Sequence, residues 1–153
     1  MRGIFTGWGI RILIVGAIAV GGVLFRDRLS ANAGELRVGD CFDDPAGSVQ
    51  VIEDVSHHPC TEAHDNEVFV VATHPAAKDA PFPSDPEIET FIDQTCVPQF
   101  ESYTGRSAAS ESALDLGWYS PTSTGWATGD RVVICFLYNV DGAKLTMPLK
   151  KAG

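Results

Sequence analysis

The runs Val38-Gly39-Asp40-Cys41-Phe42 and Glu67-Val68-Phe69-Val70-Val71 decide the fold of this chain. They lie within residues 36–71, which also contain Val49-Gln50-Val51-Ile52, Cys60 and three histidines (His57, His58 and His64). Short runs of β-branched and aromatic residues bounded by Gly, Asp and Pro are typical of strands joined by turns. The region therefore predicts the opening strands of a small sheet, with two cysteines close to one another.

The chain has four cysteines, Cys41, Cys60, Cys96 and Cys135, and none of them forms a Cys-x-x-Cys pair. An even number of cysteines beyond an apolar N-terminal segment is typical of disulfides formed in an oxidising compartment. Of the three possible pairings we favour two bridges. Cys41–Cys60 would join neighbours across the opening hairpin, and Cys96–Cys135 would tie a helix to a late strand. The alternative is four reduced, buried cysteines in a cytosolic fold.

The clearest helix follows a proline-rich loop at residues 74–83. Asp85 can cap it, and Pro86 suits its first turn. Pro98 predicts a kink or a restart, and Gly105 predicts the end of the helix. One helical face carries the apolar residues Ile88, Phe91, Ile92, Cys96 and Phe100.

Residues 36–42 begin the domain, and Gly39-Asp40 predicts a turn before a brief strand. Further strands are predicted at residues 49–55, 67–73, 114–119 and 129–138, with a last edge strand at residues 144–147. His57-His58-Pro59 predicts a break in pairing, and the hydrophobic run at residues 129–138 predicts a central strand buried on both faces. The expected fold class is α+β. It comprises a small antiparallel sheet of about five strands with one long helix packed on it, two disulfides, and a preceding N-terminal transmembrane helix.

Residues 12–25 are an uninterrupted apolar run. As a helix they cover about 21 Å, less than the ~30 Å hydrocarbon core, so a span would take in residues 8–25 with Trp8 at the interface. The competing interpretation is a signal peptide cleaved after Ala33. Arg26-Asp27-Arg28 directly after the run favours an uncleaved anchor. We therefore predict a transmembrane anchor and linker at residues 1–33 and an extracytoplasmic domain at residues 34–153, with the N-terminus in the cytoplasm.

Charge divides the chain in the same place. The net charge of −9 combines +3 from residues 1–33 with −12 from residues 34–153, which hold seven basic and nineteen acidic side chains. Nucleic-acid phosphates attract Lys and Arg, and a domain this acidic therefore predicts no nucleic-acid partner. The charge is otherwise consistent with a soluble surface.

An ordered set of motifs resembles a known family. The set is Val38-Gly39-Asp40-Cys41-Phe42, Pro59-Cys60, His64-Asp65-x-Glu67-Val68-Phe69, Cys96 with Phe100, Tyr103-x-Gly105, Tyr119-x-Pro121, Trp126, and Gly129-Asp130-Arg131-x-Val133-x-Cys135. In this order it resembles the septum-formation-related domain of actinobacteria, which is displayed from a membrane segment. The resemblance covers residues 36–137. It implies a role in septation and the cell envelope, without a known reaction.

One cluster offers metal-ligand types: His57, His58, Cys60, His64, Asp65 and Glu67. His and Cys suit zinc, but a disulfide at Cys60 would remove it as a ligand. The simpler interpretation is that His64 and Asp65 hydrogen-bond to the loop backbone before the next strand. We therefore expect no metal and no cofactor.

The sequence offers no catalytic residue that we would assign. It has no Gly-x-Ser-x-Gly motif, and acidic pairs such as Asp43 with Asp44 are expected on the surface of so acidic a domain. Trp118, Tyr119 and Trp126 favour core packing, although an exposed one would suit a partner or glycan. The candidate binding residues are His64, Asp65, Glu67, Trp118 and Trp126.

The predicted function is a non-enzymatic cell-envelope domain, a protein-interaction or structural module linked to septation. Its expected partners are the membrane, through residues 8–25, and unidentified envelope or division proteins. The alternative is a metal-binding or hydrolytic envelope domain using residues 57–67. A third possibility is a secreted domain released after Ala33.

Overall fold

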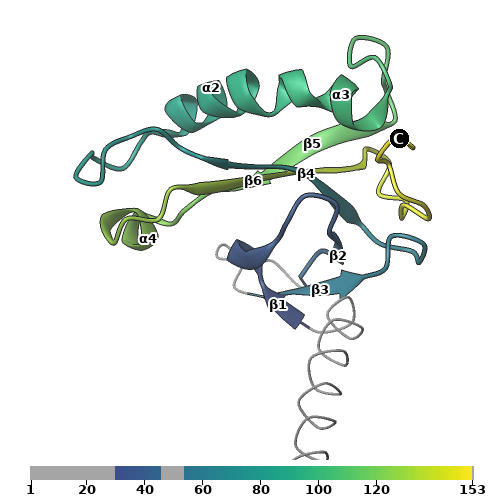
Figure 1. The fold of residues 1–153 in the computed structure, drawn as a ribbon, viewed down its shortest axis with the longest axis horizontal. Coiled ribbons are helices and arrows are strands. Elements are labelled where there is room, and N and C mark those ends of the chain that lie inside the picture. The colour runs from purple at the N-terminus through teal and green to yellow at the C-terminus, as the bar shows by residue number, and fades with distance from the viewer. Residues whose placement is uncertain (1–29, 46–53, 153) are drawn as a thin grey trace, which may run out of the picture.

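The computed structural model describes residues 30–45 and 54–152, and its main feature is a six-stranded antiparallel sheet in the order β1-β3-β2-β4-β6-β5 (Figure 1). The strands are β1 (Ser30–Asn32), β2 (Cys41–Asp43), β3 (Asp54–His58), β4 (Asn66–Thr73), β5 (Leu114–Tyr119) and β6 (Val132–Asn139). The helices are α2 (Asp85–Thr95), α3 (Phe100–Thr104) and α4 (Ser123–Ala127), with 3-10 turns η2 (Ala33–Glu35) and η3 (Val97–Gln99). The predicted α+β class is confirmed, with six strands rather than about five.

The predicted transmembrane span lies outside the described residues. Within the part of the chain that the structure describes, no helix is long and apolar enough to cross a membrane. The sheet begins upstream of the predicted domain boundary at residue 34. Residues 30–32, which the sequence placed in a linker, form β1 and pair with β3.

The long helical segment begins at Ser84, one residue before the predicted cap. Ser84 keeps an extended backbone, and its N–H and hydroxyl both donate to the Glu87 carboxylate at 2.7 Å. Asp85 was the wrong cap because it already belongs to the first helical turn. The predicted restart at Pro98 is confirmed, since η3 separates α2 from α3. Gly105 ends α3 in the left-handed conformation, as predicted.

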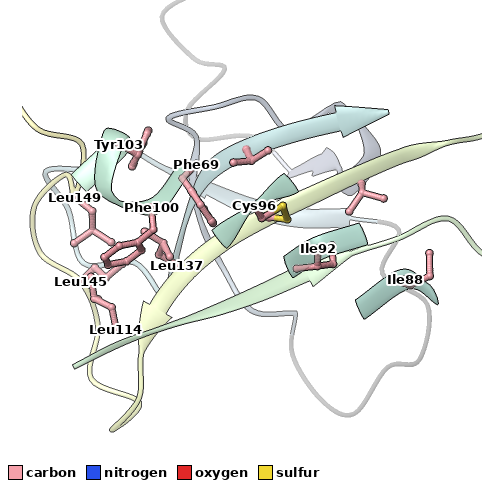
Figure 2. Packing of buried hydrophobic residues seen from close by; sticks show 13 residues of the cluster. Phe69, Ile88, Ile92, Cys96, Phe100, Tyr103, Leu114, Leu137, Leu145 and Leu149 are labelled. Carbon is pink, nitrogen blue, oxygen red and sulfur yellow. A yellow bond between two sulfur atoms is a disulfide. The ribbon is translucent and has the colours of Figure 1, made fainter. Parts of the chain in front are cut away.

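The sheet has a hydrophobic cluster on each face. The predicted apolar face of α2 and η3–α3 packs on β4, β6 and β5, together with Leu145 and Leu149 of the C-terminal segment (Figure 2). The other cluster joins Leu36, Phe42 and Val55 to Ile134 and Phe136. In Figure 1, α2 and α3 lie on one side of β4–β6–β5, and β1, β2 and β3 lie on the other. The prediction that the run at residues 129–138 is a central strand buried on both faces is confirmed for residues 133–137 of β6, and the ends of that strand are half-buried.

A β-bulge in β4 serves both clusters. Val68 pairs with Phe136 and Val70 with Cys135, so Phe69 is an extra residue in β4. Strict alternation would put Val68 and Val70 on one face. With the bulge, Val68 packs in the cluster with Phe42, whereas Phe69 and Val70 pack under α2.

Two strand predictions were wrong. His57 and His58 do not break the pairing but belong to β3, opposite Phe42 and Cys41. Val55 and His57 are buried while Ser56 is exposed, so the two-residue alternation of a strand outweighs the turn tendency of this run. Residues 144–147 form no strand, and only Leu145 makes a bridge, with His64. Residues 49–53 of the predicted second strand lie outside the described residues.

Both preferred disulfides are present. Cys41–Cys60 joins β2 to the turn after β3 with a Cα–Cα distance of 5.3 Å. Cys96–Cys135 joins the end of α2 to β6, with the Cα atoms 6.4 Å apart. The pairing prediction is therefore confirmed, and the alternative of four reduced cysteines is excluded. The second bridge holds the helical layer on the sheet, and its Cys96 lies among the apolar side chains in Figure 2.

Candidate functional site

Glu67 is a buried carboxylate at the centre of the fold, only 1 % exposed. Its Oε1 accepts hydrogen bonds from the Tyr103 hydroxyl at 2.6 Å and the Lys150 backbone N–H at 3.2 Å. Its Oε2 accepts from the Leu149 backbone N–H at 2.7 Å. The side chain thus joins β4, α3 and the C-terminal segment. All three hydrogen-bond partners donate to it, so the carboxylate acts as an internal anchor.

Tyr103 shares this environment. Burial raises the pKa of its hydroxyl well above the usual value of 10.0, and the hydrogen bond to Glu67 and the negative charge of that carboxylate raise it further. The phenol therefore remains a proton donor throughout the physiological range. It is suited to holding Glu67 in place and not to releasing a proton.

His64 lies beside this anchor and is fully buried. Its backbone exchanges two hydrogen bonds with Leu145, at 3.0 and 2.8 Å, and its Nδ1 lies 2.7 Å from the Glu62 carbonyl oxygen. Its Nε2 has no hydrogen-bond partner among the described residues. The prediction that His64 would hydrogen-bond to loop backbone is confirmed.

One group among the described residues has metal-ligand types close together. Cys41, His64 and Glu67 each offer an atom, and these atoms lie within 4.8 Å of one another. The Cys41 sulfur is already bonded to Cys60, so it cannot serve as a thiolate ligand. Both Glu67 oxygens already accept hydrogen bonds. The arrangement therefore favours a packed core around a disulfide over a metal centre.

Asp65 belongs to a different, solvent-facing network. Lys144 Nζ lies 2.7 Å from Asp43 Oδ1 and 2.9 Å from Asp65 Oδ1, and His58 Nε2 lies 2.8 Å from Asp43 Oδ2. Partial burial raises the pKa of Asp43, but the hydrogen bond from Lys144 and the charges of His58 and Lys144 outweigh it, so the pKa lies below 3.8. This network links β2 and β3 to the loops around residues 65 and 144.

Trp126 is buried and structural in its contacts. Its indole N–H donates to the Ala80 carbonyl at 2.8 Å, and the Arg131 guanidinium lies 3.7 Å from its ring centroid. Arg131 itself donates to five backbone carbonyl oxygens, those of Ala76, Ala77, Lys78, Trp126 and Asp130. A planar guanidinium with five N–H donors can hold several carbonyls together. Trp126 and Arg131 therefore fix the proline-rich loop against the sheet.

Trp118 is the most exposed of the candidate residues, with 38 % of its surface accessible to solvent. It lines a hollow of about 330 Å³ between α2 and β5, together with Ile92, Val97 and Leu116. Glu89, Asp93 and Asp115 complete the lining. We call this hollow the β5 groove. A second hollow of about 130 Å³ adjoins it and shares Val97, Asp115 and Leu116.

The five candidate binding residues thus occupy four places. His64 and Glu67 lie in the core, Asp65 in the salt-bridge network, Trp126 under the loop, and Trp118 at the β5 groove. The sequence analysis did not identify Tyr103 as the partner of Glu67 or Val97 as a groove residue. A valine just before Pro98 and outside the apolar helical stripe is the sequence signal that could have indicated the latter.

Comparison with protein families gives one finding. A family model described as septum formation matches residues 37–152, most of the chain. The chain belongs to this septum-formation family. Neither a curated protein nor a solved structure matches it. The resemblance inferred from the ordered motifs is confirmed, and the role of this septum-formation domain is related to septation.

Proposed function

We propose that this septum-formation domain is displayed outside the membrane and acts as a non-catalytic interaction module during septation. The observation that carries the proposal is that Glu67 is a buried, hydrogen-bonded structural group. This carboxylate of the region assigned to the alternative metal-binding or hydrolytic function accepts three internal hydrogen bonds and fixes the C-terminal segment. A general acid or base must reach the proton it transfers, and a carboxylate only 1 % exposed does not reach solvent.

Two further features support the location and the mode of action. Both disulfides are of the kind that persists in oxidising compartments outside the cytoplasm. Anchoring through residues 8–25 would display the domain from the membrane at its N-terminal end. Exposed apolar side chains at the β5 groove are a feature of interaction surfaces.

Location is tested with the full chain in cells of its source, with an epitope after Gly153. We expect protease added to intact cells to remove the epitope, and a cytoplasmic marker to survive. Immunofluorescence should show enrichment at division sites. An epitope that is protected until the cells are lysed would overturn the predicted orientation.

The non-catalytic part is tested with variants of the accessible polar network. Asp65→Asn and His58→Gln each remove a titratable group from this partly exposed network and keep a polar side chain of similar size. An interaction module should keep its septation function in both variants. A variant that unfolds like the wild type but loses function would instead indicate chemistry at this network.

A further inference from the structure

One edge of the sheet is protected and the other is open. β1, at one end, is only three residues long, whereas β5, at the other end, spans Leu114–Tyr119. Among the strands that the structure describes, none pairs with the outer side of β5. Edge strands in monomeric proteins are usually blocked by Lys, Pro or a bulge, and β5 has none of these.

The pattern of hydrogen bonds shows which backbone groups face outward. Val140 N–H donates to the Ala113 carbonyl at the start of the β5–β6 pairing. The Leu116 N–H donates to Oδ1 of the preceding residue, Asp115, at 2.8 Å and not to β6. Because antiparallel pairs alternate, Leu114, Leu116 and Trp118 present their N–H and carbonyl groups to the open edge.

The surface beside this edge is apolar at its floor and acidic at its rim. Trp118 and Val97 are 38 % and 44 % exposed, and Ile92 lies buried beneath them. Glu89 and Asp93 project from α2 along the same hollow, and Asp115 comes from β5 itself. Among the described residues that line the β5 groove, none is Lys, Arg or His.

This chemistry selects one kind of occupant. A strand added to β5 would place alternate side chains towards the groove, where apolar ones bury against Trp118 and Val97. At other groove-facing positions of that strand, basic side chains would meet Glu89 and Asp93. A second copy of this chain would bring Asp115 and another acidic surface against the same rim, so charge disfavours it.

We propose that the open edge of β5 and the β5 groove bind, by strand addition, an extended segment of a partner protein that carries apolar and basic side chains at its groove-facing positions. The proposal rests on the interaction role given above and specifies its surface and the chemistry of its partner. Backbone hydrogen bonds along β5 supply a sequence-independent part of the binding. Apolar contact with Trp118 and the acidic rim supply the selectivity.

The probe is a labelled peptide, Lys-Thr-Val-Thr-Lys-Thr-Val, whose alternate positions carry Lys and Val on one face. It is titrated against the full chain in mild detergent and followed by fluorescence anisotropy. We expect saturable binding, and none for the matched peptide with Glu in place of Lys. On binding, the amide hydrogens of Leu116 and Trp118 should gain protection from exchange. That gain reports pairing at the edge, which nonspecific attraction to an acidic protein would not produce.

Two pairs of variants make the test specific. Glu89→Lys with Asp93→Lys should weaken peptide binding by about tenfold or more, whereas Glu35→Lys with Asp79→Lys, an equal change of net charge at exposed sites elsewhere, should change it less than about twofold. Trp118→Ala should likewise weaken binding by about tenfold, compared with Val38→Ala at another exposed apolar residue.

Equal losses in both charge variants would show nonspecific attraction and overturn the proposal. Absence of peptide binding, or self-association of the full chain that Trp118→Ala abolishes, would also overturn it, the latter in favour of a second copy. None of these three results bears on the location of the domain at division sites, because that location is measured in a separate experiment. Failure of the domain to appear outside the membrane would contradict the proposed function itself.

Discussion

Replacing Glu67 with glutamine tests whether its carboxylate is a structural anchor. Three donors point at the two carboxylate oxygens, so the NH2 group of the glutamine must lie against at least one donor, whichever oxygen it replaces. If the amide nitrogen takes the place of Oε2, the buried Leu149 N–H loses its acceptor. If it takes the place of Oε1, the Tyr103 hydroxyl can turn, but the Lys150 N–H loses its acceptor.

The expected loss in the free energy of unfolding follows from these two orientations of the amide. An unsatisfied buried donor costs about 1–3 kcal/mol, and hydrogen bonds to a charged acceptor are stronger than those to a neutral one. The orientation that sacrifices the longer bond, at 3.2 Å to Lys150, is the cheaper. We therefore expect Glu67→Gln to lower the free energy of unfolding by about 2 kcal/mol.

The assay is urea unfolding of the full chain in mild detergent, followed by tryptophan fluorescence and extrapolated linearly to water. Glu89→Gln makes the same chemical change at an exposed helical position and should stay within about 0.5 kcal/mol of the wild type. Hydrogen exchange provides a local readout, because the Leu149 amide should lose protection in Glu67→Gln. Tyr103→Phe completes a double-mutant cycle with it.

Two results would refute the reasoning. Glu67→Gln could prove as stable as Glu89→Gln, which would mean that the carboxylate contributes no more than an exposed one. Alternatively, the cycle could show no coupling between positions 67 and 103, which would contradict the 2.6 Å hydrogen bond as a stabilising interaction.

Three further perturbations have defined outcomes. Lys144→Met should raise the Asp43 pKa towards 3.8, which a carboxyl NMR titration measures. The lowered pKa of the wild type stabilises the fold above about pH 4, and this stabilisation is lost as the pH falls through the folded-state pKa. The stability of the variant should therefore depend less on acid pH than that of the wild type. Arg131→Lys should lower the free energy of unfolding by about 2–4 kcal/mol, because an ammonium group cannot reach five carbonyl oxygens. The amide hydrogens of residues 76–80 should also exchange faster. An unchanged melting curve would contradict this. Gly117→Ala should cost about 1–3 kcal/mol in urea unfolding, because its methyl group would collide with the Phe136 ring, whereas Gly125→Ala meets its nearest atoms at 3.4 Å and should cost less.

Local sequence signals predicted the elements that depend on local physics. Pro98 and Gly105 marked the restart and end of the helix because one lacks a backbone donor and the other tolerates a left-handed conformation. The run at residues 132–138 was long and apolar enough to predict a strand paired on both sides. The cysteine pairing followed because each bridge joins elements that the predicted order already placed together.

The features that the sequence could not predict depend on contacts between distant residues. His57 and His58 continue β3 because β2 lies opposite them, and no signal within the run itself shows that. The bulge at Phe69 exists because two different cores must be filled from one strand. Glu67 was identified as a polar candidate, but its donors at residues 103, 149 and 150 lie far along the chain.

The anchor at Glu67 also bears on how the chain is made. Its carboxylate is in β4, in the first half of the sequence, and two of its three donors are backbone groups of Leu149 and Lys150. During synthesis β4 emerges long before residues 149 and 150 do, so the carboxylate cannot be buried at low cost until they have been made. A product that stops short of residue 149 lacks two of the three donors to this buried charge and keeps only the Tyr103 hydroxyl. Residues 149 and 150 are therefore needed for stable burial of Glu67, and we expect products that end before them to be proteolysed more readily.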